Sequence, residues 1–288
     1  MFWRSAKLYL FVLPLVLFTL LLLVYPILYS FALSFRDATV ETFVSGEMPW
    51  NGFTNYQTAV SDPTFVTALT NTVVFTFFSI LFQFSIGFLL ALFFQPAFPL
   101  KNALISVLLV PWLAPIITAA NIFKGLFHEL GVVNQIGHLL GFPTILWLAD
   151  SHYALVATIV ANIWIGFPFN FILLYAGMRS IPEEIYEAAK LDGASYWRRV
   201  THITFPILRP VTVAVLMLGT IYTVKVFDLV WIMTQGGPAN SSHLLSTLSY
   251  QIGFSTAQLN FGQAAAIATV VVLLILLLNG FQLFLRRR

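Results

Sequence analysis

Residues 181–210 read IPEEIYEAAKLDGASYWRRVTHITFPILRP, the longest strongly polar and charge-rich stretch of the chain. The segments on either side of it are apolar and long enough to cross a membrane. Pro182 suits the first turn of a short helix, and Gly193 allows the left-handed conformation that ends one. Ser195 can cap a second helix that runs to about Ile203. The stretch therefore predicts a helical loop outside the membrane, between two spans.

The composition of the whole chain indicates a membrane protein. Charged residues make up 9% of the 288 residues, hydrophobic residues make up 59%, and the mean hydropathy is +0.89. Soluble domains carry about 25% charged residues. We therefore predict an all-α fold, a polytopic membrane helix bundle with six transmembrane helices in a single domain over residues 1–288. The predicted spans cover residues 8–33, 68–94, 103–127, 153–178, 211–233 and 261–285.

The basic residues predict the orientation of these spans. Cytoplasmic loops carry an excess of Lys and Arg. The outer side of the predicted topology has only Arg36. Both termini and the 179–209 loop are therefore expected in the cytoplasm. This asymmetry also explains the net charge of +3 without any nucleic-acid partner. The basic residues of the other side are Arg4, Lys7, Lys101, Arg179, Lys190, Arg198, Arg199, Arg209 and Arg286–Arg288.

Motifs for catalysis are missing from the sequence. The chain has no cysteine, its five histidines lie outside any tight metal-ligand spacing, and no Gly-Lys pair or Gly-x-Ser-x-Gly occurs. We therefore expect no enzyme activity, no metal and no bound cofactor in this chain. If ATP drives the protein, a separate chain must hydrolyse it.

The polar loop carries a motif with a specific spacing. Glu187-Ala188-Ala189 is followed by Asp192-Gly193-Ala194, then by Ile203, and then by two prolines four residues apart, at 206 and 210. This order resembles the cytoplasmic coupling motif of bacterial ABC importer permeases, although Phe205 stands where the family usually has Leu. The alternative is a solvated connector without a partner. The resemblance implies that the ATPase docks on Glu187, Ala188, Ala189, Asp192 and Gly193.

A second stretch resembles the carbohydrate-uptake branch of these permeases. Phe227-Asp228-Leu229-Val230 precedes Gly236-Gly237-Pro238, and Asn71-Thr72 stands at the head of the second span. The pattern is similar to the first permease subunit of maltose-type and glycerol-phosphate-type importers. It implies import of a sugar or related polyhydroxylated solute across the cytoplasmic (inner) membrane of a bacterium or archaeon. The implied partners are a second permease subunit, two ATPase subunits that hold ATP and Mg, an external solute-binding protein and the lipid bilayer.

Polar residues within the spans are candidates for the solute pathway. Lys225 and Asp228 are three residues apart, which predicts one face of the fifth helix. They either neutralise each other or leave Asp228 to accept hydrogen bonds from sugar hydroxyls. Amides suit hydroxyl groups, and flat aromatic rings suit the apolar faces of sugars. The further candidates are Trp231, Asn121, Asn162, Trp164 and Asn170.

Helix-breaking residues interrupt the third and fourth predicted spans, at Pro111, Pro115, Gly166 and Pro168. Broken helices often mark a midplane binding site or a hinge, and ordinary kinking is the alternative. Three other functions remain open. An ABC permease for another solute class would share the coupling loop, a secondary transporter would more often show an inverted repeat, and a membrane enzyme would need a catalytic cluster. A sugar and a sugar phosphate both remain open as solutes.

Overall fold

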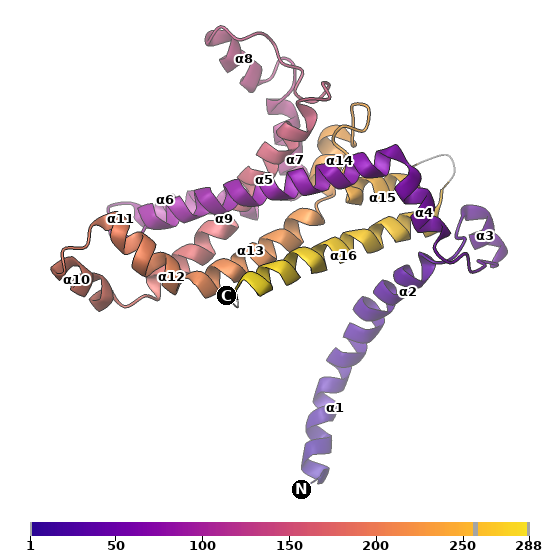
Figure 1. Ribbon diagram of the computed structural model, residues 1–288, viewed down its shortest axis with the longest axis horizontal. Helices are drawn as coiled ribbons and strands as arrows, with labels where there is room; N and C mark the ends of the chain where they lie inside the picture. Colours follow the sequence, from indigo (N-terminus) through magenta and orange to yellow (C-terminus); the bar gives the residue numbers. More distant parts are fainter. Residues whose placement is uncertain (1, 256–258, 287–288) are drawn as a thin grey trace. The chain divides into compact units, whose positions relative to one another are not determined.

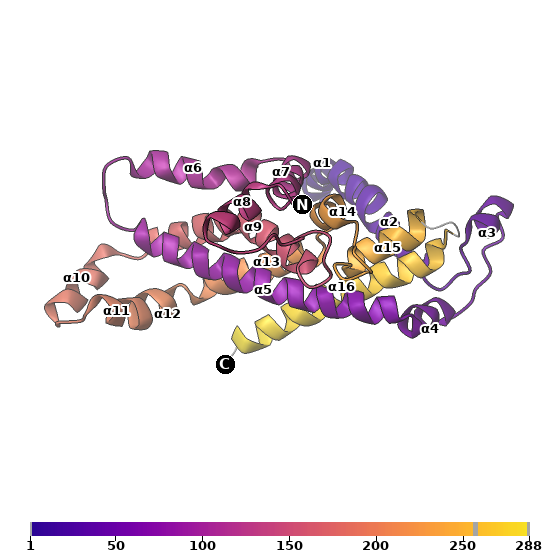
Figure 2. The same ribbon diagram turned by 90° about the horizontal axis from the view of Figure 1, so that it is seen from above.

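The computed structural model describes residues 2–255 and 259–286, which fold into two compact helical units (Figures 1 and 2). Unit 1 is the described part of Met1–Phe65 and Leu248–Val270, and unit 2 is the described part of Val66–Thr247 and Val271–Arg288. Helices suit a membrane chain because each backbone group finds its partner within its own segment. The structure confirms the expected helical fold.

Unit 1 begins with the first predicted span. It consists of α1 (Phe2–Thr19), the π-helix η1 (Leu20–Val24) and α2 (Tyr25–Leu33). At the end of η1, Tyr25 N–H donates to the carbonyl of Leu20, five residues earlier. The next residue is Pro26, whose ring conflicts with an α-helical carbonyl four residues back and has no N–H to bond it. The wider turn therefore accommodates the proline while the span stays helical.

The loop that follows the first span is also part of unit 1. It contains α3 (Val40–Ser45) and α4 (Thr54–Ser61). The buried amide of Asn55 donates to the carbonyls of Ser34 (2.9 Å) and Arg36 (2.8 Å). Gly262 N–H donates to the carbonyl of Ala38 at 3.1 Å. These bonds hold the loop against the start of α16 (Phe261–Arg286).

Unit 2 is built around the long helix α9 (Ala154–Arg179). This helix packs against α6 and α13, while α7 packs against α14 (Figures 1 and 2). Phe171 and Leu174 of α9 are fully buried in the core of this unit. The other helices that lie wholly or partly in unit 2 are α5 (Pro63–Phe93), α6 (Lys101–Leu113), α7 (Ile116–Leu126), α8 (Val132–Leu139), α10 (Glu183–Leu191), α11 (Tyr196–Arg199), η2 (Val200–Thr204), α12 (Phe205–Ile207), α13 (Arg209–Val224), α14 (Asp228–Thr234), α15 (Leu245–Phe254) and α16.

Within residues 2–255 and 259–286, four helical segments are long and apolar enough to span a membrane, and two bent pairs raise the number to six if each pair is one span. The segment α1–α2, α5, α9 and α16 match four predicted spans. The third predicted span is the pair α6 and α7, bent by 93° at Pro115. The expected interruption at Pro115 is therefore confirmed. Gly166 and Pro168, in contrast, do not end α9.

The fifth predicted span is not one helix, which corrects the expectation that Lys225 and Asp228 share a helix face. Helix α13 ends at Val224 and α14 begins at Asp228. The carbonyl of Val226, freed by this break, accepts a hydrogen bond from Ser246 Oγ. Broken helices are tolerated at membrane depth when side chains satisfy the freed backbone groups. No sequence pattern near Lys225 predicts that Ser246 bonds to this carbonyl.

Candidate functional site

The predicted coupling loop forms a short exposed helix that ends in a glycine cap. Helix α10 follows Pro182, and Gly193 lies after it in the left-handed region with φ of 74°. Ala194 N–H donates to the carbonyl of Ala189 (2.9 Å), and Gly193 N–H donates to that of Lys190 (3.0 Å). These two bonds form a Schellman motif, which satisfies the last carbonyls of the helix. The predicted role of Gly193 as a helix terminator is confirmed.

The second predicted helix of the loop is less regular than expected. Ser195 caps it, as predicted, by accepting from Arg198 N–H at 3.4 Å. The α-helical part ends after one turn, at Arg199, and the π-helix η2 replaces it through Thr204. Helices α10, α11 and α12 lie together at one end of unit 2 (Figure 1).

The outward face of α10 has the properties of a docking surface. Glu187, Ala188, Asp192 and Gly193 are exposed, and Ala189 is half-buried. Leu191, at the end of α10, is 89% exposed and adds an apolar side chain to this surface. Small alanines between acidic and apolar neighbours leave a low ridge that can enter a groove of another protein.

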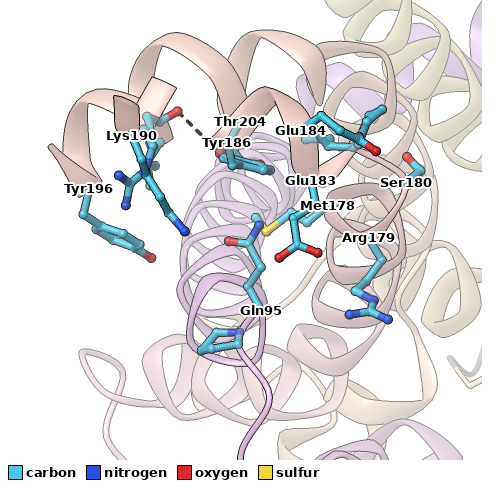
Figure 3. Close-up of a pocket in the computed structure, with 15 residues that line it drawn as sticks. Gln95, Met178, Arg179, Ser180, Glu183, Glu184, Tyr186, Lys190, Tyr196 and Thr204 are labelled. Carbon is cyan, nitrogen blue, oxygen red and sulfur yellow. Dashed lines mark hydrogen bonds between the residues drawn. The ribbon is translucent and has the colours of Figure 1, made fainter. Parts of the chain in front are cut away.

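The inward side of α10 borders a pocket of about 710 Å³ (Figure 3). Figure 3 shows Tyr186 directed toward Thr204, with Lys190 and Tyr196 on one side and Arg179 on the other. The pocket lies between the loop and the ends of α5 and α9, where Gln95 and Met178 line it. Four residues of α10 line this pocket, namely Glu183, Glu184, Tyr186 and Lys190.

A second pocket of about 290 Å³ lies between the spans of unit 2. It opens where α13 breaks from α14 and is bordered by α5, α6, α7 and α9. The broken helix thus marks a membrane pocket, as broken spans often do. Its polar and aromatic lining residues are Gln83, Trp112, Asn162, Phe169, Tyr222, Thr223, Lys225, Phe227 and Asp228.

The amide of Asn162 gives this pocket an unused hydrogen-bond donor. Asn162 is 7% exposed, and its Nδ2 has no hydrogen-bond partner among the described residues. Its main-chain carbonyl accepts from Gln83 Nε2 at 2.8 Å. Gly166 makes room for Gln83, because a Cβ at that glycine would lie 2.3 Å from Gln83 Nε2. A buried donor without a partner costs about 1–3 kcal/mol.

The two charged residues of the pocket stand at opposite helix ends. Lys225 is the C-cap of α13 and Asp228 is the first residue of α14. The helix dipole favours a cation at a C-terminus and an anion at an N-terminus. Lys225 Nζ also lies 5.1 Å from the ring centroid of Tyr222. No ion pair joins the two residues in the described chain, so their expected mutual neutralisation is not found.

Aromatic rings form a row along one wall of the pocket. The ring centroids of Trp112 and Phe169 are 5.9 Å apart, and those of Phe169 and Tyr222 are 5.8 Å apart. The sequence reading missed these three residues and Gln83. Aromatic residues are 16% of this chain, so residue type alone does not distinguish the ones that line a pocket.

The other predicted pathway residues lie outside the pocket lining. Asn121 is exposed and donates to the carbonyl of Ile117 within its own helix. Trp164 packs on Phe123, with 5.4 Å between the ring centroids. Trp231 stacks on Phe227, which does line the pocket, and the buried Asn170 donates to the carbonyl of Gly166.

The glycine-rich turn at Gly236 and Gly237 is fixed to α5 near Asn71 and Thr72. Asn71 Nδ2 donates to the carbonyls of Ser241 (2.9 Å) and His243 (3.1 Å), and Leu245 N–H donates to Thr72 Oγ1 at 2.9 Å. Gly236 has φ of 82°, and a Cβ there would collide with the His243 ring. The Asn71-Thr72 pair and the Gly-Gly-Pro turn therefore belong to one structural unit.

Neither pocket has the side chains of a metal centre. In residues 2–255 and 259–286, no group of three or more His, Cys, Asp or Glu side chains could hold a metal ion. Both pockets combine hydrogen-bonding groups with apolar walls.

Comparisons with known proteins agree with this architecture. The trehalose/maltose transport system permease protein MalF of Thermococcus litoralis is 34% identical over 275 residues, which are 94% of this chain and 92% of that protein. The arabinooligosaccharides transport system permease protein AraP of Bacillus subtilis is 33% identical, over 97% of this chain and 89% of that protein. A chain of a bacterial ABC transporter involved in the import of the acidic polysaccharide alginate superposes with a TM-score of 0.85 at 25% identity, over 99% of this chain and 96% of that chain.

The family described as binding-protein-dependent transport system inner membrane component matches residues 83–288. That range contains every lining residue of both pockets, and it includes the whole predicted coupling loop. The relatives are transport permeases and not enzymes. The chain therefore belongs to the family of inner membrane components of binding-protein-dependent transport systems, as a multi-pass permease.

Proposed function

We propose that this permease carries a carbohydrate or a related polyhydroxylated solute into the cytoplasm, as one subunit of an ATP-driven importer. The observation that carries the proposal is the unpaired, buried amide of Asn162 in a pocket between broken spans. A sugar hydroxyl can accept from that amide. The row of Trp112, Phe169 and Tyr222 offers apolar faces on which a sugar ring can rest.

The relatives support the same class of solute. Their names specify trehalose/maltose and arabinooligosaccharides, and the transporter with the superposable chain imports alginate. In this chain, Lys225 supplies a donor and Asp228 an acceptor at the mouth of the helix break. Such a mixed set suits hydroxyl groups, which both donate and accept.

The exposed ridge of α10 supports an ATPase partner. We infer that an ATPase subunit, which holds ATP and Mg, docks on Glu187, Ala188, Ala189, Asp192 and Gly193. ATP hydrolysis would then move the coupling loop from the cytoplasmic side, where both chain termini also lie. We further propose that the chain acts as one permease domain, paired with a second permease subunit and two ATPase subunits.

An external binding protein completes the proposed assembly. A chain of the alginate transporter in complex with an alginate pentasaccharide-bound periplasmic protein shares the fold of this chain. We propose that a comparable protein delivers solute to the outer loops at residues 35–67 and 234–260. The hydrogen bonds from Asn71 to the carbonyls of Ser241 and His243 hold part of the second loop in a fixed conformation.

The proposal is tested by uptake into vesicles that contain the assembled transporter. The solutes are radiolabelled di- and oligosaccharides, with an amino acid as comparison. Asn162→Ala should lower uptake of the transported sugar about fivefold to a hundredfold, the effect of losing a hydrogen bond worth about 1–3 kcal/mol. Asn121→Ala is the matched control, because Asn121 lies outside the pocket, and it should transport normally. Uptake of the amino acid and of no sugar would contradict the proposed solute class.

A further inference from the structure

One side chain makes the main contact between the coupling helix and the rest of its own subunit. Of the nine residues of α10, Tyr186 and Ala189 are half-buried and the others are exposed. The Tyr186 hydroxyl lies 2.9 Å from Thr204 Oγ1, within hydrogen-bond distance. Among the described residues, no other α10 side chain makes a hydrogen bond. The Tyr186 ring also packs against a buried core cluster of unit 2.

The partner of Tyr186 stands five residues before α13, from which α12 and a bend of 69° separate it. Thr204 is 1% exposed and is the last residue of the π-helix η2. Phe205 N–H donates to the carbonyl of Val200, five residues earlier, and Pro206 follows. The π-helix η2 thus lies between α10 and α13. Turns of π-helix are frequent at functional sites.

The surroundings of this bond are open. The pocket of about 710 Å³ includes both Tyr186 and Thr204 in its lining, together with the exposed Arg179 and Lys190 (Figure 3). Close-packed interiors pass displacements on through many contacts at once. Around α10 that packing is missing, so a displacement of the helix reaches the spans chiefly through Tyr186 and through the backbone at its two ends.

We propose that the Tyr186–Thr204 hydrogen bond is the link that transmits movement of the coupling helix to the fifth span. Tyr186 is in this sense a positioning residue, because it acts on the solute pocket through α13. Helix α13 carries Tyr222 and Thr223 to that pocket and ends at its Lys225 border. The inference rests on the proposed function, since it assumes that an ATPase moves α10.

The test measures how much solute is imported for each ATP hydrolysed. The variants are Tyr186→Phe and Thr204→Val, which each remove one hydroxyl and keep the shape of the side chain. Both variants should assemble and keep solute-stimulated ATP hydrolysis within about twofold of wild type. The amount of solute imported per ATP should fall about fivefold, which is the effect of losing one neutral hydrogen bond on a two-state equilibrium. Thr204→Val also removes the bond from Thr204 Oγ1 to the Arg199 carbonyl (3.5 Å), whereas Tyr186→Phe removes only the Tyr186–Thr204 bond. The double variant should therefore match Thr204→Val, because the Tyr186–Thr204 bond is already lost there.

Two controls distinguish the loss of the Tyr186–Thr204 hydrogen bond from a general effect of changing the pocket. Tyr196→Phe removes a hydroxyl from the same pocket, where Tyr196 makes no side-chain hydrogen bond in the described chain, and it should couple normally. Thr204→Ser keeps the hydroxyl and should restore most of the wild-type ratio.

Three results would overturn the link. They are an unchanged ratio in Tyr186→Phe, an equal loss in Tyr196→Phe, and additive losses in the double variant. Failure of the proposed function has a different signature, because the wild-type complex itself would then import no sugar at the expense of ATP.

Discussion

Replacing Gly87 with alanine should separate α5 from α9 and destabilise the protein. Gly87 is buried where these two helices cross. A Cβ at this position would lie 2.7 Å from Asn170 Cβ and 2.8 Å from the backbone nitrogen of Phe171. The first distance is about 0.7 Å shorter than ordinary van der Waals contact in a close-packed interior. Because the second neighbour is backbone, a side-chain rotation cannot relieve the clash.

The expected change in the free energy of unfolding is the difference between two opposing effects. Overpacking costs about 1–3 kcal/mol, and alanine gains about 0.5–1 kcal/mol over glycine inside a helix. We therefore expect a net loss centred on about 1 kcal/mol and at most about 2.5 kcal/mol, which lowers the thermal midpoint of a chain of this size by about 2–4 °C per kcal/mol. Gln83 lies one turn away on the same face of α5, so its bond to the Asn162 carbonyl should weaken too.

The assay is thermal unfolding of the detergent-purified protein, followed by the loss of its monodisperse peak in size-exclusion chromatography. Gly125→Ala is the matched control, because Gly125 is also helical and a Cβ there meets no atom within 4 Å. The control should be as stable as wild type or slightly more stable. Equal midpoints for Gly87→Ala and Gly125→Ala would refute the close helix crossing.

Three further predictions concern coupling, charge and topology. Gly193→Val places a β-branched residue at φ of 74°, where a side chain strains the backbone although a Cβ would meet no atom within 4 Å. This strained helix end should lower both solute uptake and solute-stimulated ATP hydrolysis, and full activity of both in an assembled complex would contradict the prediction. Asp228→Asn should reduce uptake, and adding Lys225→Gln should not rescue it because each charge serves its own helix end; recovery in the double variant would show a functional ion pair. In this cysteine-free chain, Ser195→Cys should react with an impermeant maleimide only from the cytoplasm and Ser45→Cys only from outside, and the reverse pattern would overturn the orientation.

The sequence predicted the spans well because bilayer thickness sets their length and composition. It also predicted the bend at Pro115 and the end of α10 at Gly193, since both depend on the backbone of one residue. Local chemistry of this kind is visible in sequence without knowledge of the partners.

The break in the fifth span could not be predicted in the same way. It depends on Ser246, which reaches the Val226 carbonyl from twenty residues away. The pocket lining shows the same limit, because Asn162 was among the predicted residues while its neighbour Gln83 was not. Gln83 fits against α9 because Gly166 has no side chain. A contact of this kind between two helices cannot be predicted from the sequence of either helix alone.

The most direct test of an ATP-driven permease is solute uptake by sealed proteoliposomes that contain the assembled complex. ATP is enclosed on the side of the coupling loop, and loaded binding protein is added on the other side. Uptake should require both, and Ala188→Glu should abolish it by obstructing the docking ridge of α10. Uptake that continues without ATP, driven by an ion gradient and unaffected by Ala188→Glu, would contradict the account and indicate a secondary transporter.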